Sequence, residues 1–193
     1  MNAERETIEK IIAGDTQRFS VVIEQYKRLV YNIAFRMVQN AADREDLCQD
    51  IFVKVYRNLS TFQFESKLST WIAKIAFNTC VNHLKKKRVP LLHDVAPDKF
   101  FIEEVSDRKK SPDEEMECSD IASKLTREIE NLPVVFRTVL TLFHLEQMSY
   151  GEIAAVTALP GGTVKSYLFR ARKLLRQRLT QQYAQEELWE RGV

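Results

Sequence analysis

The chain has 193 residues, which is enough for one large or two small domains, and its 45% hydrophobic and 29% charged residues exclude a disordered tail. Five Gly, five Pro and the absence of long β-branched alternations favour helices over strands. No apolar run is long enough to cross a bilayer, and charges occur throughout residues 1–30. We therefore expect no membrane insertion, no signal peptide and a cytoplasmic location.

Charge is distributed unevenly along the chain, although the net charge is only +2. Residues 1–90 hold 15 Lys and Arg against 10 Asp and Glu, a net charge of +5. Residues 91–120 hold 4 against 10, a net of −6, and residues 121–193 hold 10 against 7, a net of +3. Two basic segments around an acidic one suit two domains that face nucleic acid, although the acidic segment can also be an ordinary solvated loop.

The three cysteines are widely spaced, at Cys48, Cys80 and Cys118. An odd number at such spacing is no disulfide framework, and no second pair of ligands completes a metal site. We expect all three to be small apolar fillers, and the sequence implies no metal and no cofactor.

The first part of the chain is predicted to form consecutive helices. Apolar residues recur at helical intervals over four ranges: 4–13, 16–38, 43–59 and 69–88. The segment Gly14-Asp15 ends the first helix, and Pro90 ends the domain.

The helix expected over 43–59 has an outward face in which carboxylates and an amide surround an apolar side chain. Its members are Asp46, Gln49, Asp50 and Val53. Such a face is either simply solvated or a surface that docks a protein, and the spacing alone leaves both readings open. Acid–base catalysis is not favoured, because Asp46 and Asp50 lie one turn apart with no nucleophile or pocket nearby.

The helix expected over 69–88 has an exposed face on which a tryptophan, two asparagines and lysines are mixed. The face includes Trp71, Asn78, Asn82 and Lys86. Rings and amides suit the stacking and edge-bonding of unpaired bases, while lysines hold the backbone. The preceding loop, with Phe64, is suited to line a pocket for an unstacked base. The closing basic run, which ends at Arg88, either compensates the helix dipole or meets phosphates.

Residues 91–116 lack periodicity and are rich in acid, so we expect a flexible linker there. Helices resume over about 117–131 and 133–145, and a tail follows residue 179.

The segment 149–176 is the most informative in the chain, because it predicts a helix-turn-helix. Two short helices surround the turn at Pro160-Gly161-Gly162, and Thr163 can cap the second helix. The usual glycine of such turns falls at Ala158, so either Ala158 accepts a strained φ or the turn differs. An ordinary amphipathic hairpin is the alternative reading.

The second of these helices is predicted to have one buried stripe and one cationic face. The buried stripe is Val164, Leu168, Ala171 and Leu175. The opposite half and its flanks carry Lys165, Ser166, Phe169, Arg170, Arg172, Lys173 and Arg176. Such a face suits phosphates, and side chains near the helix start reach base edges.

Taken together, these segments resemble a bacterial RNA polymerase sigma factor of the extracytoplasmic-function group, the two-domain members of the sigma-70 family. Region 2.2 of that family resembles DREDLCQDIFVKVYRNLSTF, and regions 2.3 and 2.4 resemble STWIAKIAFNTCVNHLKKKR. Region 4 resembles LPVVFRTVLTLFHLEQMSYGEIAAVTALPGGTVKSYLFRARKLL. The resemblance implies an all-α fold of two small helical domains. A region 2 domain covers 1–90, an acidic linker 91–116, and a region 4 domain with a C-terminal tail 117–193.

The resemblance also implies roles for the outward residues. The β′ clamp helices of core RNA polymerase are expected to meet Asp46, Gln49, Asp50 and Val53. Unpaired bases and phosphates at the minus-ten element are expected to meet Phe64, Trp71, Asn78, Asn82, Lys86 and Arg88. Contacts to the minus-thirty-five element are expected from Thr163, Lys165, Ser166, Phe169, Arg170, Arg172 and Lys173. Tyr167 stands where the family often has Arg, which affects the expected promoter preference.

The expected function is therefore that of a non-enzymatic specificity subunit. Its implied partners are core RNA polymerase (β′ clamp helices and β flap), promoter DNA and an anti-sigma factor that can hold it at the membrane. No obligate homo-oligomer is expected. One alternative is a stand-alone helix-turn-helix regulator of duplex DNA, which leaves the faces around Asp46 and Asn78 unexplained. An enzyme is disfavoured, because His83, His93 and His144 lie in separate segments with no phosphate loop.

Overall fold

The computed structural model describes residues 2–87 and 120–182, and every regular element in these two ranges is helical. The first range contains α1 (Asn2–Ile12), η1 (Thr16–Arg18), α2 (Phe19–Met37), α3 (Ala41–Asn58), η2 (Leu59–Thr61) and α4 (Leu68–Lys86), where η marks a 3-10 helix. The second contains α5 (Asp120–Glu130), α6 (Val134–His144), α7 (Tyr150–Thr157) and α8 (Gly161–Gln182). The predicted all-α fold is confirmed. The predicted linker over 91–116, Cys118, and the tail after 182 lie outside the described residues.

Helix boundaries follow local capping chemistry. Asn40 caps α3, because its side chain accepts a hydrogen bond from the Asp43 backbone N–H, so the helix expected from residue 43 starts at Ala41. The helix expected from residue 16 begins as the 3-10 turn η1, and α2 proper starts at Phe19.

The apolar side of α4 is packed against α2 and α3. Ala73, Ala76 and Cys80 on that side are fully buried, and their small side chains leave room for close helix contacts. Cys80 is thus the apolar filler that we expected, and burial raises the pKa of its thiol to about 12. Cys48 is half-buried.

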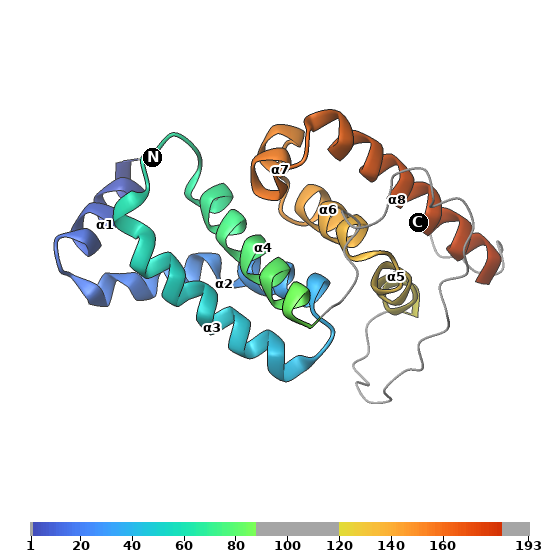
Figure 1. Cartoon of the computed structure of the whole chain (residues 1–193), viewed down its shortest axis with the longest axis horizontal. Helices are drawn as coiled ribbons and strands as arrows, with labels where there is room; N and C mark the ends of the chain where they lie inside the picture. The colour runs from blue at the N-terminus through green and yellow to red at the C-terminus, as the bar shows by residue number, and fades with distance from the viewer. Residues whose placement is uncertain (1, 88–119, 183–193) are drawn as a thin grey trace.

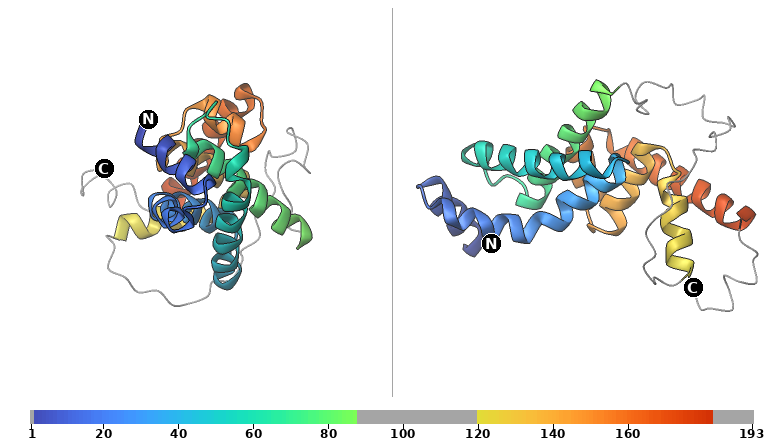
Figure 2. Two further views of the ribbon diagram at one scale, coloured as in Figure 1. Left: turned by 90° about the vertical axis from the view of Figure 1, so that its left-hand side faces the viewer. Right: turned by 90° about the horizontal axis from the view of Figure 1, so that it is seen from below.

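The two described halves pack against each other along α4 and α7 and along α2 and α6 (Figure 1). Buried residues of both halves form one hydrophobic cluster. Figure 2 shows α5 and the end of α8 projecting away from α1–α4.

Polar contacts also link the two halves. The Asn32 side chain donates a hydrogen bond of 2.7 Å to Glu146, and Lys67 Nζ lies 2.9 Å from Glu152 Oε1. Arg137 is buried and donates to the Met37 carbonyl oxygen at 3.4 Å. Burial lowers the pKa of Arg137 to about 10.

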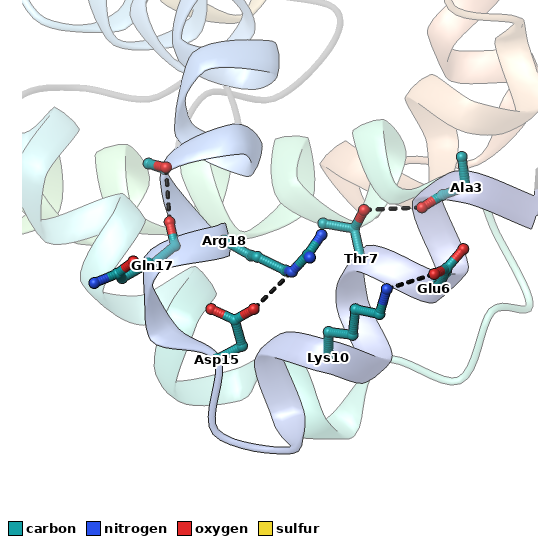
Figure 3. Close-up of polar contacts among 8 residues, drawn as sticks. Ala3, Glu6, Thr7, Lys10, Asp15, Gln17 and Arg18 are labelled. Carbon is teal, nitrogen blue, oxygen red and sulfur yellow. Dashed lines mark hydrogen bonds and ion pairs between the residues drawn. The ribbon is translucent and has the colours of Figure 1, made fainter.

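The surface of α1 and η1 carries short-range ion pairs. Lys10 pairs with Glu6 at 2.5 Å, and Arg18 pairs with Asp15 at 2.6 Å (Figure 3). Because all four side chains are exposed, solvent screens both pairs and their contribution to stability is small. Within the described ranges, none of the helices combines the length and hydropathy that a membrane-spanning helix needs.

Candidate nucleic-acid and polymerase interfaces

The outward face of α4 is open to solvent where the sequence predicts it. Asn78, Asn82 and Lys86 are exposed, and Trp71 is half-buried. The opposite side of the same helix is buried, so packing against α2 and α3 fixes which side faces outward. Arg88 lies outside the described residues. The remaining members of the face are exposed or half-buried.

The loop before α4 carries a short ladder of rings. Phe62 is buried, and its ring centroid lies 4.8 Å from that of Phe64 and 5.4 Å from that of Trp71. Phe64 is 37% exposed and has a φ of 58°. The ladder therefore joins the exposed ring of the loop to Trp71 on α4.

The outward face of α3 is also as predicted. Asp46, Gln49 and Asp50 are exposed, and Val53 is 46% exposed among them. Leu47, Ile51 and Val55 are buried on the opposite side. The result is an acidic surface with one apolar side chain within it, which suits a protein partner.

The first helix of the helix-turn-helix is strongly capped. Ser149 and Glu152 form a capping box: the Ser149 hydroxyl accepts from the Glu152 N–H, and the Glu152 carboxylate accepts from the Ser149 N–H at 2.8 Å. The backbone hydrogen bond from Ser149, followed by the Lys67 ammonium, lowers the pKa of Glu152 to about 2. The helix ends at Ala158, whose φ of 57° is left-handed, so Ala158 does accept the conformation that glycine favours.

The second helix begins earlier than predicted. We expected Thr163 to be the cap, but α8 starts at Gly161 and Thr163 lies in its first turn. The reason is that the Pro160 carbonyl oxygen accepts hydrogen bonds from the backbone N–H groups of both Thr163 and Val164. Thr163 is therefore part of the first turn of α8 and not its cap.

The faces of α8 largely agree with the predicted pattern. Of the predicted buried stripe, Val164, Leu168 and Ala171 are buried, and Leu175 is half-buried. Exposed positions include Lys165, Ser166, Phe169, Arg170, Arg172, Lys173 and Arg176. Phe169 is 68% exposed, which is unusual for a ring and leaves it available for an apolar contact with a base.

Arg172 is engaged within the protein, which the sequence did not indicate. Its guanidinium lies 3.1 Å from His144 Nε2 and 5.1 Å from the centroid of the Phe143 ring. Burial, and then the charge of Arg172, lowers the pKa of His144. This contact joins α8 to the end of α6. No local sequence pattern predicts it, because 28 residues separate Arg172 from His144.

Tyr167 is buried and packs edge-to-face on Phe136, with ring centroids 5.4 Å apart. It therefore belongs to the core and not to the exposed face of α8. Within residues 2–87 and 120–182, no group of His, Cys, Asp and Glu side chains could hold a metal ion.

Comparison with known proteins identifies both halves. The family model for sigma-70 region 2 matches residues 22–89, and the model for sigma-70 region 4 matches residues 122–175. RNA polymerase sigma-H factor of Pseudomonas aeruginosa is 34% identical over 176 residues, which are 89% of this chain and 91% of that protein. This chain belongs to the sigma-70 family, in its extracytoplasmic-function group.

Two other sigma factors are also similar to this chain. The extracytoplasmic-function sigma factor SigW of Bacillus subtilis is 27% identical over 91% of this chain and 96% of its own length. A solved structure of the sigma factor RpoE in complex with the anti-sigma factor NepR, from Bartonella quintana, is 24% identical with a TM-score of 0.63. It covers 84% of this chain and 96% of that chain, and shows a similar fold. Region 2 of this sigma factor spans α2–α4, and region 4 spans α5–α7 with most of α8.

Proposed function

We propose that this sigma factor binds core RNA polymerase, recognises the minus-thirty-five and minus-ten promoter elements, and promotes melting at the start of transcription. The exposed face of α8 reads duplex DNA in the major groove. The exposed face of α4, with the Phe64 loop, captures bases of the unpaired strand. The observation that carries the proposal is the presence in one chain of a cationic helix-turn-helix surface and a separate ring-and-amide surface.

The two surfaces suit two states of DNA. A basic helix such as α8 enters a major groove and contacts phosphates and base edges. Rings and amides such as Trp71, Asn78 and Asn82 bind best to bases that have left the stack. Capture of an unstacked base offsets part of the free energy of opening the duplex, so binding favours the melted state without any catalytic step by this chain.

The acidic surface of α3 is proposed to bind core polymerase. Asp46, Gln49, Asp50 and Val53 would meet the β′ clamp helices, and the region 4 half would meet the β flap. Polymerase then determines the distance between the two DNA-binding surfaces. The protein acts as one copy in the cytoplasm, with an anti-sigma factor as a further partner that can hold it at the membrane.

Reconstitution with core polymerase tests the proposal. The purified protein is expected to co-elute with core RNA polymerase and to direct run-off transcription from a cognate promoter. A protein that binds duplex tightly as a dimer and leaves core polymerase inactive would be a stand-alone regulator instead.

Charge reversal at Asp46 and Asp50 tests the α3 surface. The variant Asp46→Lys/Asp50→Lys is expected to lower the affinity for core polymerase by about tenfold or more, because close charge pairs at interfaces are strongly coupled. The matched control is Glu6→Lys/Glu24→Lys, which reverses two exposed carboxylates whose ion pairs, among the described residues, are with lysines of their own helices. Equal core affinity in the two variants would remove the α3 surface from the proposal.

A further inference from the structure

Phe64 has a backbone conformation that a bulky side chain rarely adopts. Its φ of 58° lies in the left-handed region, where Cβ crowds the backbone. The ring is 37% exposed, so burial of this side chain is incomplete. A strained conformation retained at a partly exposed ring points to a use for the ring in binding.

The Phe64 ring makes a cation–π contact with an arginine side chain. The guanidinium carbon of Arg5, on α1, lies 4.8 Å from the centroid of the Phe64 ring. Phe64 in turn contacts Phe62, with the two rings tilted by 55°, and Phe62 contacts Trp71 with the rings tilted by 51°. The result is a ladder of four planar groups, Arg5, Phe64, Phe62 and Trp71, that runs from α1 across the loop to α4.

The outer end of this ladder is accessible. The Arg5 side chain is 60% exposed, and its Nε donates a hydrogen bond of 2.9 Å to Glu9 Oε1. Among the described residues, no hydrogen bond engages the two terminal amino groups of Arg5. Glu9 therefore holds one edge of the guanidinium, while its terminal amino groups and the side of its plane away from Phe64 stay open to a ligand.

We infer that Arg5 extends the single-strand site: an unpaired base next to the minus-ten element stacks on the Arg5 guanidinium, whose free amino groups bond the adjacent phosphate. This inference rests on the proposed function, because it assumes that the Phe64 loop meets the unpaired strand. A guanidinium plane stacks on bases as a ring does, and it carries the charge that a phosphate requires. Arg5 precedes the segment that the region 2 model matches, residues 22–89, so this contact lies outside that match.

The chemistry distinguishes arginine from other cations at this position. Lysine supplies a positive charge but no plane, so it can meet a phosphate without stacking on a base. Salt screens the attraction to phosphate, whereas it has little effect on stacking. Replacement of Arg5 by Lys and by Ala therefore separates the two parts of the contact.

Holoenzyme binding to a promoter with a preformed bubble tests this inference. Core polymerase is loaded with the wild-type chain, Arg5→Ala, Arg5→Lys or Arg18→Ala, and each holoenzyme is titrated with the bubble promoter. 2-Aminopurine replaces one unpaired non-template base at a time, so that fluorescence quenching reports stacking. Arg18 is the matched control, since it is an exposed arginine of the same N-terminal segment and pairs with Asp15 at 2.6 Å (Figure 3).

Arg5→Ala is expected to bind the bubble promoter about tenfold more weakly, the scale of one lost stacking contact, and to lose quenching at one base. Arg5→Lys is expected to recover part of the affinity at low salt and none of the quenching, and Arg18→Ala to match the wild type. The inference would be overturned if Arg5→Ala and Arg18→Ala bound the bubble promoter with equal affinity. It would also be overturned if Arg5→Lys showed the full wild-type quenching. A wild-type chain that fails to bind core polymerase refutes the proposed function instead, so the two failures are distinguishable.

Discussion

Ala158 ends α7 in a conformation that is unfavourable for any residue with a Cβ. Its φ of 57° and ψ of 23° are left-handed, and glycine reaches them without steric conflict. Because Ala158 is exposed, its methyl group adds little packing in return. The helix-turn-helix therefore keeps a local strain that a single substitution can remove.

Ala158→Gly is expected to raise the free energy of unfolding by about 1 kcal/mol, since it relieves the left-handed alanine. The matched control is Ala155→Gly, at an exposed position within α7. This control is expected to lower the free energy of unfolding by about 1 kcal/mol. Urea unfolding of the three proteins measures both changes. The same sign for the two substitutions would contradict the interpretation of the turn.

The sequence singled out Ala158, because a turn of this kind requires a left-handed residue at a known place, and the structure shows the first of the two alternatives, a left-handed alanine. The sequence also predicted which residues of α8 face outward, since helical periodicity alone determines the side. It could not place Arg172 on His144, or Arg5 on Phe64, because these contacts join residues that are distant in the chain. Tyr167 was predictable only in part: its departure from the family pattern was visible, but its burial against Phe136 was not.

At the scale of elements, Glu152 takes part both in the N-terminal cap of α7 and in an ion pair with Lys67, the residue before α4. Its carboxylate accepts from Ser149 at the start of α7 and lies 2.9 Å from Lys67, which precedes α4. Both partners favour the ionised carboxylate and hold the pKa of Glu152 near 2, below the usual value of 4.5. A carboxylate with a lowered pKa in the folded state stabilises the fold above the unfolded pKa, and this contribution disappears as the pH falls.

Glu152→Gln is therefore expected to be less stable than the wild type at neutral pH, by about 1 kcal/mol for the weakened cap. The difference should shrink as the pH falls from about 4.5 to about 2, because the wild-type carboxylate then becomes neutral as well. Thermal or urea unfolding of both proteins across this range measures the difference. A difference that stays constant or grows toward low pH would show that ionisation of Glu152 does not stabilise the fold.

Periodicity predicted the helices themselves, but their ends depended on single hydrogen bonds. Asn40 and the Pro160 carbonyl oxygen each start a helix earlier than the apolar pattern suggested. The contact of α4 with α7 could not be predicted from the sequence. The apolar residues of each helix can be buried within its own half, so the pattern does not require the other helix.

At the scale of the whole molecule, the packing of the two halves conflicts with simultaneous binding to both promoter elements. The names of the elements place them about 25 base pairs apart, which is about 85 Å along B-DNA. Here α4 packs directly on α7, which in turn packs on α8 (Figure 1). Helices in contact are about 8–10 Å apart, so the two surfaces proposed to bind DNA are far too close in this arrangement.

The halves must therefore separate before both elements are bound. The 32 residues between Lys87 and Asp120 can span at most about 110 Å when extended, which is sufficient for this separation. The contacts that must break include Asn32 with Glu146 and Lys67 with Glu152. Binding of core polymerase through both halves supplies free energy for the change, because a ligand shifts an equilibrium only by its differential affinity for the two states.

A covalent link between the halves tests this requirement. In a chain whose three native cysteines are replaced by serine or alanine, Asn32→Cys and Glu146→Cys are joined by a short, reducible thiol crosslinker. The linked protein is expected to bind a duplex minus-thirty-five fragment but to lose run-off transcription by more than about tenfold, because α4 and α8 cannot move apart. Reduction of the linker should restore transcription, and the single variant Asn32→Cys treated with the same reagent should remain active. If the linked chain still opened the promoter at the wild-type rate, the contact of α4 with α7 would be compatible with initiation and the halves would have no need to separate.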